Sequence, residues 1–172
     1  LAHDAAAAGL SVRTVLGDMC DLARHASLPA PELIVCAGDT LTHLASLDEV
    51  ARLIHDAAKS LASGGHLVLT FRDYSTARVG PDRFIPVRSD AGRIFTCFLE
   101  FGPTHVTVHD LVHTRDASSS AWSMSVSVFE KVRISPAFVR AQFFSAGLTL
   151  VHDDLTAGLA TIVARRQLPA SS

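Results

Sequence analysis

The feature that most constrains the fold is a strand, a helix and a second strand joined by short links. Residues 33–37 form a short apolar run without interruption, which is typical of a strand buried on both faces of a sheet. Apolar residues then recur at helical spacing from Asp48, the predicted N-cap, until a glycine pair ends the helix. Residues 66–71 form the next apolar run. This order predicts a parallel, doubly wound α/β sheet with a right-handed crossover.

A further strand is expected before this unit, because residues 12–16 are rich in β-branched side chains and lead into Gly17 and Asp18. Residues 1–9 read as the end of a helix. The chain starts with Leu1 rather than Met, inside a stretch of helical composition. These features favour the interpretation that the sequence is a fragment of a longer protein.

The second half of the chain changes character. Three stretches read as successive strands without intervening helices, and they should pair antiparallel: residues 94–100, 105–113 and 122–129. The last of these alternates serine with apolar side chains that we interpret as core: Trp122, Met124, Val126 and Val128. A helix that begins after Ser135 and two closing strands complete the pattern. We expect a single domain over residues 1–172, with 94–130 as an antiparallel insertion.

Composition narrows the functional classes. The 172 residues are 48% hydrophobic, enough to bury the core of one domain. Charged residues make up 19% and the net charge is -2, so no extended basic face is available and nucleic acid is not an expected partner. The three cysteines are odd in number and widely spaced, which fits a reducing compartment, and we expect a cytoplasmic protein. No apolar run approaches the roughly 20 residues of a membrane span.

Ligands of open α/β sheets bind beyond the carboxyl ends of the parallel strands. Polar or charged residues follow the predicted strands at three such places: residues 17–19, 37–43 and 72–74. Taken singly, Asp18 and Asp39 are explained as turn residues, His43 as a helix-surface residue and Arg72 as a solvated strand end. Their coincidence at one edge of the sheet favours a ligand site.

Three runs in this order resemble the class I S-adenosylmethionine-dependent methyltransferases. Residues 17–22, Gly-Asp-Met-Cys-Asp-Leu, resemble the acidic segment after the third strand, and residues 61–69, Leu-Ala-Ser-Gly-Gly-His-Leu-Val-Leu, the entry to the fifth. Residues 33–44 resemble the fourth-strand motif. The glycine N-methyltransferase-like group is the most similar, since its Gly-Asn-Ser, His-Leu and Arg-Asn-Tyr segments correspond to Gly38-Asp39-Thr40, His43-Leu44 and Arg72-Asp73-Tyr74. The resemblance implies an N-terminally truncated Rossmann-like sheet with an antiparallel insertion after the fifth strand.

The resemblance also implies how S-adenosylmethionine, the methyl donor, would be held. Asp18 would accept a hydrogen bond from the adenine amino group, and the backbone of Met19 would meet the ring. Ala37 and Gly38 would face the methionine part. The chain contains no GxGxG loop and no acidic residue after a second strand to bind the ribose. Both are expected upstream of residue 1, so this fragment alone should be inactive and should bind the cofactor poorly.

The acceptor site that the resemblance implies is made of four residues. Asp39 and His43 would lie near the reacting methyl group, with His43 either a general base or a positioning residue. Arg72 would bind an acceptor carboxylate and Tyr74 would wall the pocket. Because Asp39 and Asp73 stand where the group has asparagine, added negative charge disfavours glycine as the acceptor. We expect a small molecule with an amine or an amino-acid-like nucleophile, attracted by Asp39.

Other readings of the sequence remain open. A nicotinamide-dependent oxidoreductase would share much of the sheet, but the chain lacks a Tyr-x-x-x-Lys pair and ends in antiparallel strands. A non-catalytic methyltransferase-like partner subunit is a further alternative. A metal site is not expected: His105 and His109 lie about 13 Å apart along a regular strand, too far for one ion. The sequence says nothing of the oligomeric state.

Overall fold

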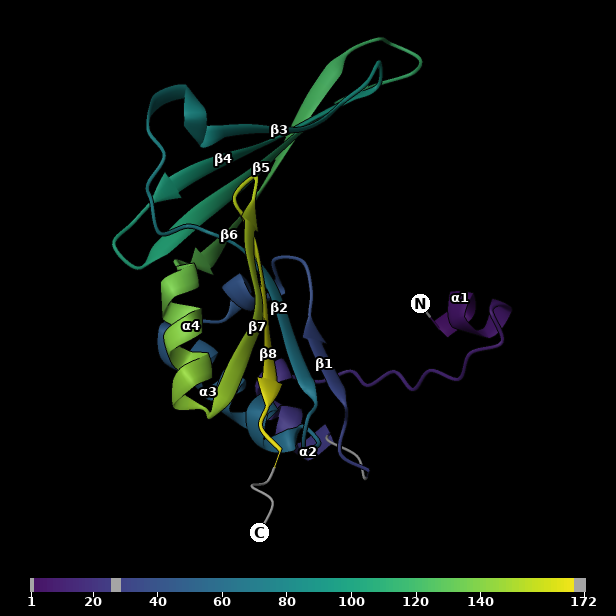
Figure 1. Cartoon of the computed structure of the whole chain (residues 1–172). Helices are drawn as coiled ribbons and strands as arrows, with labels where there is room; N and C mark the ends of the chain where they lie inside the picture. Colours follow the sequence, from purple (N-terminus) through teal and green to yellow (C-terminus); the bar gives the residue numbers. More distant parts are fainter. Residues whose placement is uncertain (1, 26–28, 169–172) are drawn as a thin grey trace.

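The computed structural model describes residues 2–25 and 29–168, and it contains two four-stranded β-sheets (Figure 1). Sheet A has the order β1 (Leu33–Cys36), β2 (His66–Arg72), β8 (Leu159–Arg166), β7 (Leu148–Thr156). Sheet B has the order β3 (Phe84–Ser89), β4 (Arg93–Phe101), β5 (His105–Arg115), β6 (Trp122–Val132). The α-helices are α1 (Ala2–Ala7), α2 (Leu22–His25), α3 (Leu47–Ser60) and α4 (Pro136–Ser145). Three 3-10 turns are η1 (Met19–Asp21), η2 (Thr40–His43) and η3 (Gly80–Arg83).

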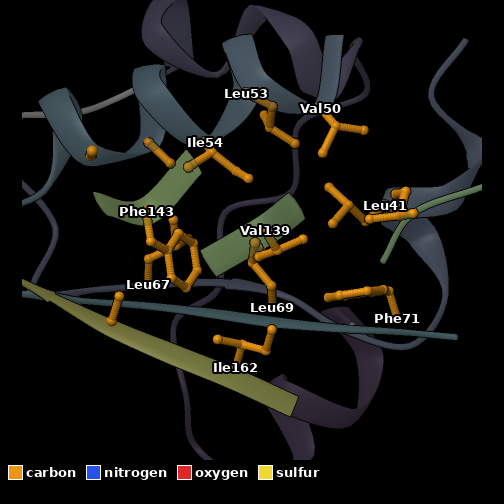
Figure 2. Packing of buried hydrophobic residues seen from close by; sticks show 14 of the residues in the cluster. Leu41, Val50, Leu53, Ile54, Leu67, Leu69, Phe71, Val139, Phe143 and Ile162 are labelled. Atoms are coloured by element: carbon orange, nitrogen blue, oxygen red, sulfur yellow. The ribbon is translucent and has the colours of Figure 1, made fainter. Parts of the chain in front are cut away.

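The predicted strand, helix and strand of the first half are confirmed as β1, α3 and β2. The N-cap of α3 is Ser46, whose hydroxyl accepts from the Glu49 N–H at 3.2 Å, and not Asp48 as predicted. Asp48 lies in the first turn instead, where its negative charge still interacts favourably with the positive end of the helix dipole. The apolar face of α3 then packs on sheet A, as Figure 2 shows for Val50, Leu53 and Ile54.

Sheet A is mixed. Strands β1 and β2 are parallel, as predicted, whereas β8 runs antiparallel to both of its neighbours, β2 and β7. Helices α3 and α4 contribute to one buried cluster with β2 and β8, so both cover the same face of the sheet (Figure 2). No described helix is long and apolar enough to cross a membrane.

The face of β1 that points away from helices α3 and α4 is exposed. Leu33 is 57% and Val35 52% exposed, so the prediction of a strand buried on both faces is wrong. The apolar run is present, but within residues 2–25 and 29–168 only the face of β1 that carries Ile34 and Cys36 packs against the core.

The strand predicted at residues 12–16 is not formed. These residues are irregular and lead away from both sheets toward α1 (Figure 1), with Val12 43% and Val15 49% exposed. A strand is stable only when a neighbour satisfies its backbone groups. The described chain offers no strand beside this segment. Its β-branched side chains cannot replace the missing backbone hydrogen bonds.

The predicted antiparallel strands of the second half are confirmed as β4, β5 and β6. Strand β3 was not predicted, because Pro86 interrupts its pattern; the strand tolerates proline as an edge strand with an irregular register beside it. The apolar side chains of β6 are not core, contrary to the prediction. They lie on the exposed face of sheet B: Trp122, Met124, Val126 and Val128.

One arginine connects the two sheets at their junction. The Arg133 guanidinium donates to the carbonyl oxygens of Tyr74 at 2.9 Å, Ser75 at 2.7 Å and Gly102 at 2.7 Å. These carbonyls belong to the segment after β2 and to the turn between β4 and β5. Arg133 therefore fixes the start of sheet B beside the end of β2.

Candidate functional site

A cavity of about 420 Å³ lies beside the carboxyl end of β1. Its rim is formed by the segment before α2 and by the turn after β1, and its floor by core residues of α3 and β2. The lining residues on which the site depends are Gly17, Asp18, Met19, Ala37 and Thr40. Three residues predicted from distant parts of the sequence to bind the cofactor, Asp18, Met19 and Ala37, therefore line one cavity.

The position of Asp18 is fixed by its own backbone neighbourhood. Its Oδ1 accepts from the Cys20 N–H at 2.8 Å and so caps η1. The carboxylate is exposed, and the Cys20 thiol lies beside it as a further donor. Met19, the first residue of η1, is partly buried against the core. The pair presents an acceptor oxygen beside an apolar surface, which suits a planar ring with an amino group.

The turn after β1 separates the cavity from a second group of side chains. Gly38 has a φ of +76°, a conformation that favours glycine, and its carbonyl accepts from the Thr70 hydroxyl at 3.1 Å. The Thr40 hydroxyl donates to the Ala37 carbonyl at 3.0 Å. Gly38 does not line the cavity. It turns the chain so that Ala37 lies on the cavity side and Asp39 faces β2 and β6.

Asp39 is held by three donors. Its Oδ1 accepts from the Arg72 backbone N–H at 2.9 Å, and its Oδ2 accepts from the Tyr74 hydroxyl at 3.2 Å and from the Lys131 ammonium. The side chain of Asp39 is 17% and that of Lys131 11% exposed. Lys131 lies on β6, so this ion pair joins the turn after β1 to sheet B. The negative charge of Asp39 is compensated by a partner that sequence reasoning did not identify.

A signal for Lys131 was present in the sequence. Lys131 continues the alternation of β6 on the face that carries Phe129, so a regular strand places a lysine beside an aromatic residue near the buried end. The Lys131 ammonium lies 6.0 Å from the centroid of the Tyr74 ring and 5.7 Å from that of Phe129. Both distances are typical of cation–π contacts.

His43 and Arg72 are the exposed groups of the site. The His43 ring stacks on Phe129 with centroids 5.5 Å apart, and among the described residues neither ring nitrogen has a hydrogen-bond partner. Arg72 ends β2 with an exposed side chain, and no described carboxylate pairs with its guanidinium. A proton acceptor and a cation are therefore available to a ligand near the compensated Asp39.

Tyr74 and Cys97 stay protonated over the physiological range. Burial, with the Asp39 carboxylate beside it, raises the pKa of the Tyr74 phenol well above its usual range. Burial also raises the pKa of the Cys97 thiol to about 12, and its S–H donates to Asp110 Oδ1 at 3.0 Å. Near neutral pH the Tyr74 hydroxyl therefore donates to Asp39, and the protonated Cys97 thiol is disfavoured as a nucleophile.

The three histidines of β5 do not share a common contact. His105 Nε2 lies 3.0 Å from the Ala45 carbonyl, and His109 Nε2 lies 2.5 Å from Glu100 Oε2. His113 Nδ1 is buried without a hydrogen-bond partner. Within the described chain no group of three histidine, cysteine or acidic side chains is placed to hold a metal ion.

The fold is shared with solved structures of known proteins. A S-adenosylmethionine-dependent methyltransferase from Clostridium acetobutylicum matches with a TM-score of 0.73 at 12% identity, over 96% of this chain and 69% of that one. The chain has the methyltransferase fold. CalS10, an amino pentose methyltransferase from Micromonospora echinaspora, matches at 0.69 with 19% identity over 88% of this chain and 63% of that one. KedS8, a sugar N-methyltransferase from Streptoalloteichus, matches with a TM-score of 0.67 at 20% identity, over 95% of this chain and 66% of that one.

The chain spans only 63 to 69% of the length of these three proteins. No protein-family model and no curated protein matches it. The grouping with glycine N-methyltransferase-like proteins stays a prediction.

Proposed function

We propose that this chain is part of a S-adenosylmethionine-dependent methyltransferase that acts on the amine or amino-acid-like nucleophile of a small molecule. The observation that carries the proposal is the cavity shared by Asp18, Met19 and Ala37 on a methyltransferase fold. The names of CalS10 and KedS8, an amino pentose and a sugar N-methyltransferase, support nitrogen as the methylated atom.

The residues at the cavity rim fit the adenosyl part of the cofactor. The exposed Asp18 carboxylate can accept from an exocyclic amino group, while Met19 offers a soft apolar surface for the ring. A volume of about 420 Å³ lies within the usual range of small-molecule sites. S-Adenosylmethionine, when bound, supplies an electrophilic methyl group. We propose that the remaining contacts come from a glycine-rich loop and from an acidic residue that binds the ribose, both upstream of residue 1.

On the acceptor side, the side chains have separate tasks. His43, in its neutral form, can take the proton that an acceptor ammonium must lose before its nitrogen attacks, or the proton that a hydroxyl group loses as it attacks. Arg72 offers its planar guanidinium to a carboxylate of the acceptor. Tyr74, which is buried beside Asp39 and stays protonated, would wall the acceptor site.

The ion pair with Lys131 changes how Asp39 would act. A carboxylate already bound by three donors attracts an amine less than a free one. It also opposes a carboxylate at Arg72 less than the sequence suggested. We therefore propose that Asp39 orders the pocket, and that Arg72 and His43 contact the acceptor.

The experiment is a methyl-transfer assay on the longer protein that includes the region upstream of residue 1, with a panel of amines, amino acids and amino sugars. The expected result is S-adenosylhomocysteine and a methylated amine detected by mass spectrometry. His43→Gln should lower kcat by about 100-fold or more if it is the base, and Arg72→Met should raise KM only for acceptors with a carboxylate.

Binding measurements separate the alternatives. Calorimetry that shows binding of NADH and not of S-adenosylmethionine would replace the proposal with the oxidoreductase. Tight cofactor binding without turnover of any acceptor on the panel would favour the non-catalytic partner subunit.

A further inference from the structure

Strand β6 is the last strand of sheet B, so one side of its backbone has no partner in the described chain. Unpaired edges invite pairing with another chain, and proteins usually protect them with charges, prolines, bulges or short length. The unprotected part of β6 is residues 122–128. It contains no charged residue and no proline, and its register with β5 is continuous from Trp122 to Val132.

The other three sheet edges are protected. Strand β3 carries Pro86 and Arg88 with an irregularity between them. Strand β7 has an irregular register after Leu150, followed by Asp153 and Asp154. Strand β1 is only four residues long. Residues 122–128 therefore form the one long, regular and neutral edge among the described strands.

The side chains of this edge are exposed as well. Trp122 is 47%, Met124 58%, Val126 48% and Val128 56% exposed. On the same face of sheet B, His113 and His109 of β5 lie next to this edge, and Ile94 and Phe84 beyond them are 38% and 49% exposed. A row of exposed apolar side chains along an unpaired edge marks a protein interface more often than a solvated surface.

We propose that a second copy of this chain occupies this edge, with β6 paired antiparallel to β6 across a two-fold axis at Ser125. In this register Trp122 lies opposite Val128, Met124 opposite Val126, and Ser123 opposite Ser127. Apolar side chains meet apolar ones and serines meet serines, as an isologous interface requires. Glu130 falls beyond the paired stretch.

Other registers pair apolar side chains with polar residues or with residues outside the strand. An axis at Val126 brings Trp122 opposite Glu130, and an axis at Met124 leaves Val128 opposite Ser120, outside the strand. The β5–β6 hairpin extends away from sheet A (Figure 1), so its edge is accessible. At the other end of β6, Phe129 and Lys131 contact His43 and Asp39, and the pairing leaves these contacts in place.

The first test is the solution mass of this chain, measured by sedimentation velocity over the micromolar range. The expected mass is twice 18.3 kDa. Met124→Lys with Val126→Lys brings lysines together across the axis and should weaken the dimer by about tenfold or more. Phe144→Lys, at a residue 85% exposed on α4, is the control and should leave the mass unchanged. A monomeric parent chain, or a lysine variant that dimerises as well as the parent, would overturn the proposal.

The second test locates the axis and does not depend on loss of folding. A Ser125→Cys variant should form a disulfide between two copies, because only this residue faces itself, and opposed side chains lie about 5 Å apart. In Ser127→Cys the new thiol faces Ser123 and should not self-link. Peptide mapping assigns the bond against the native thiols. A link at residue 127 as strong as at residue 125 rules out this register.

Discussion

Asp39 is the residue at which the turn after β1, the end of β2 and strand β6 meet. Its carboxylate accepts from the Arg72 backbone N–H at the end of β2, from the Tyr74 hydroxyl just after β2 and from Lys131 on β6. Both members of the ion pair are largely buried. A buried pair contributes little relative to an apolar replacement, but loss of one partner leaves an uncompensated charge.

This asymmetry predicts a strong coupling between the two side chains. Asp39→Asn and Lys131→Met should each lower the free energy of unfolding by about 3 kcal/mol, because each leaves the other group unpaired. The double variant should lose much less than the sum of the two. Urea unfolding of the four proteins gives the interaction energy as a double-mutant cycle. Additive losses would show that the pair does not form.

The buried Tyr74 phenol should ionise at a higher pH in the folded chain than in the unfolded chain. Tyr74 is the only tyrosine, so phenolate absorbance at alkaline pH reports on this residue alone. Burial and Asp39 raise its pKa in the folded state, so folding favours the neutral phenol. The free energy of unfolding should be unaffected by Tyr74 below about pH 10, the ordinary pKa of tyrosine, and should decline as the pH rises above it.

The measurement compares the folded and the denatured chain. Phenolate should appear near pH 10 in denaturant and only at higher pH in the folded chain. Tyr74→Phe should flatten the decline in stability above pH 10 relative to the parent chain. A folded chain whose phenolate forms at the ordinary pH would contradict the buried hydrogen bond with Asp39.

The sequence indicated the cavity residues better than the charge network. Asp18, Met19 and Ala37 follow predicted strand ends or match motifs, and all three line the cavity. Lys131 lies 92 residues from Asp39. Its partner depends on how sheet B docks on sheet A, which no local pattern encodes.

At the scale of elements, Arg133 joins the two sheets through three backbone carbonyls. A lysine can reach one carbonyl where the guanidinium reaches three. Arg133→Lys should therefore lower the free energy of unfolding by about 2–3 kcal/mol. Arg140→Lys is the matched control, because its ion pair with Asp153 is partly exposed and should contribute less than about 1 kcal/mol. Equal effects in thermal or urea unfolding would show that the carbonyl contacts do not matter.

Elements with a strong periodicity were predictable, and those that depend on a neighbour were not. Helix α3 has its buried residues at helical spacing and was found, although its N-cap lies two residues before the predicted one. Residues 12–16 have strand composition but no strand beside them, so their backbone stays irregular. Strand β3 has a weak pattern, yet β4 supplies its partner.

At the scale of the whole molecule, the open side of β1 leaves both apolar side chains and backbone hydrogen-bonding groups exposed. Leu33 and Val35 are half exposed, and β1 pairs on one side only, with β2. The cavity beside it reaches core residues such as Leu53 and Leu67. Sequence patterning identified β1 as a buried strand, and this expectation is met only if a further strand and its covering helices pack there.

We propose that a region upstream of residue 1 supplies such a strand together with the glycine-rich loop, and this proposal predicts two linked changes. In residues 1–172 the amides of β1 that point away from β2 should exchange rapidly with deuterium, and calorimetry should detect little binding of S-adenosylmethionine. In the longer protein the same amides should be protected at least about tenfold, since each gains a hydrogen-bond partner and burial. Cofactor binding should appear with this protection. The amides of β8, which have partners on both sides in the shorter chain, are the internal control and should change little. Micromolar binding by residues 1–172, or unchanged exchange at β1 in the longer protein, would mean that the open edge of sheet A is not where the missing part of the cofactor site attaches.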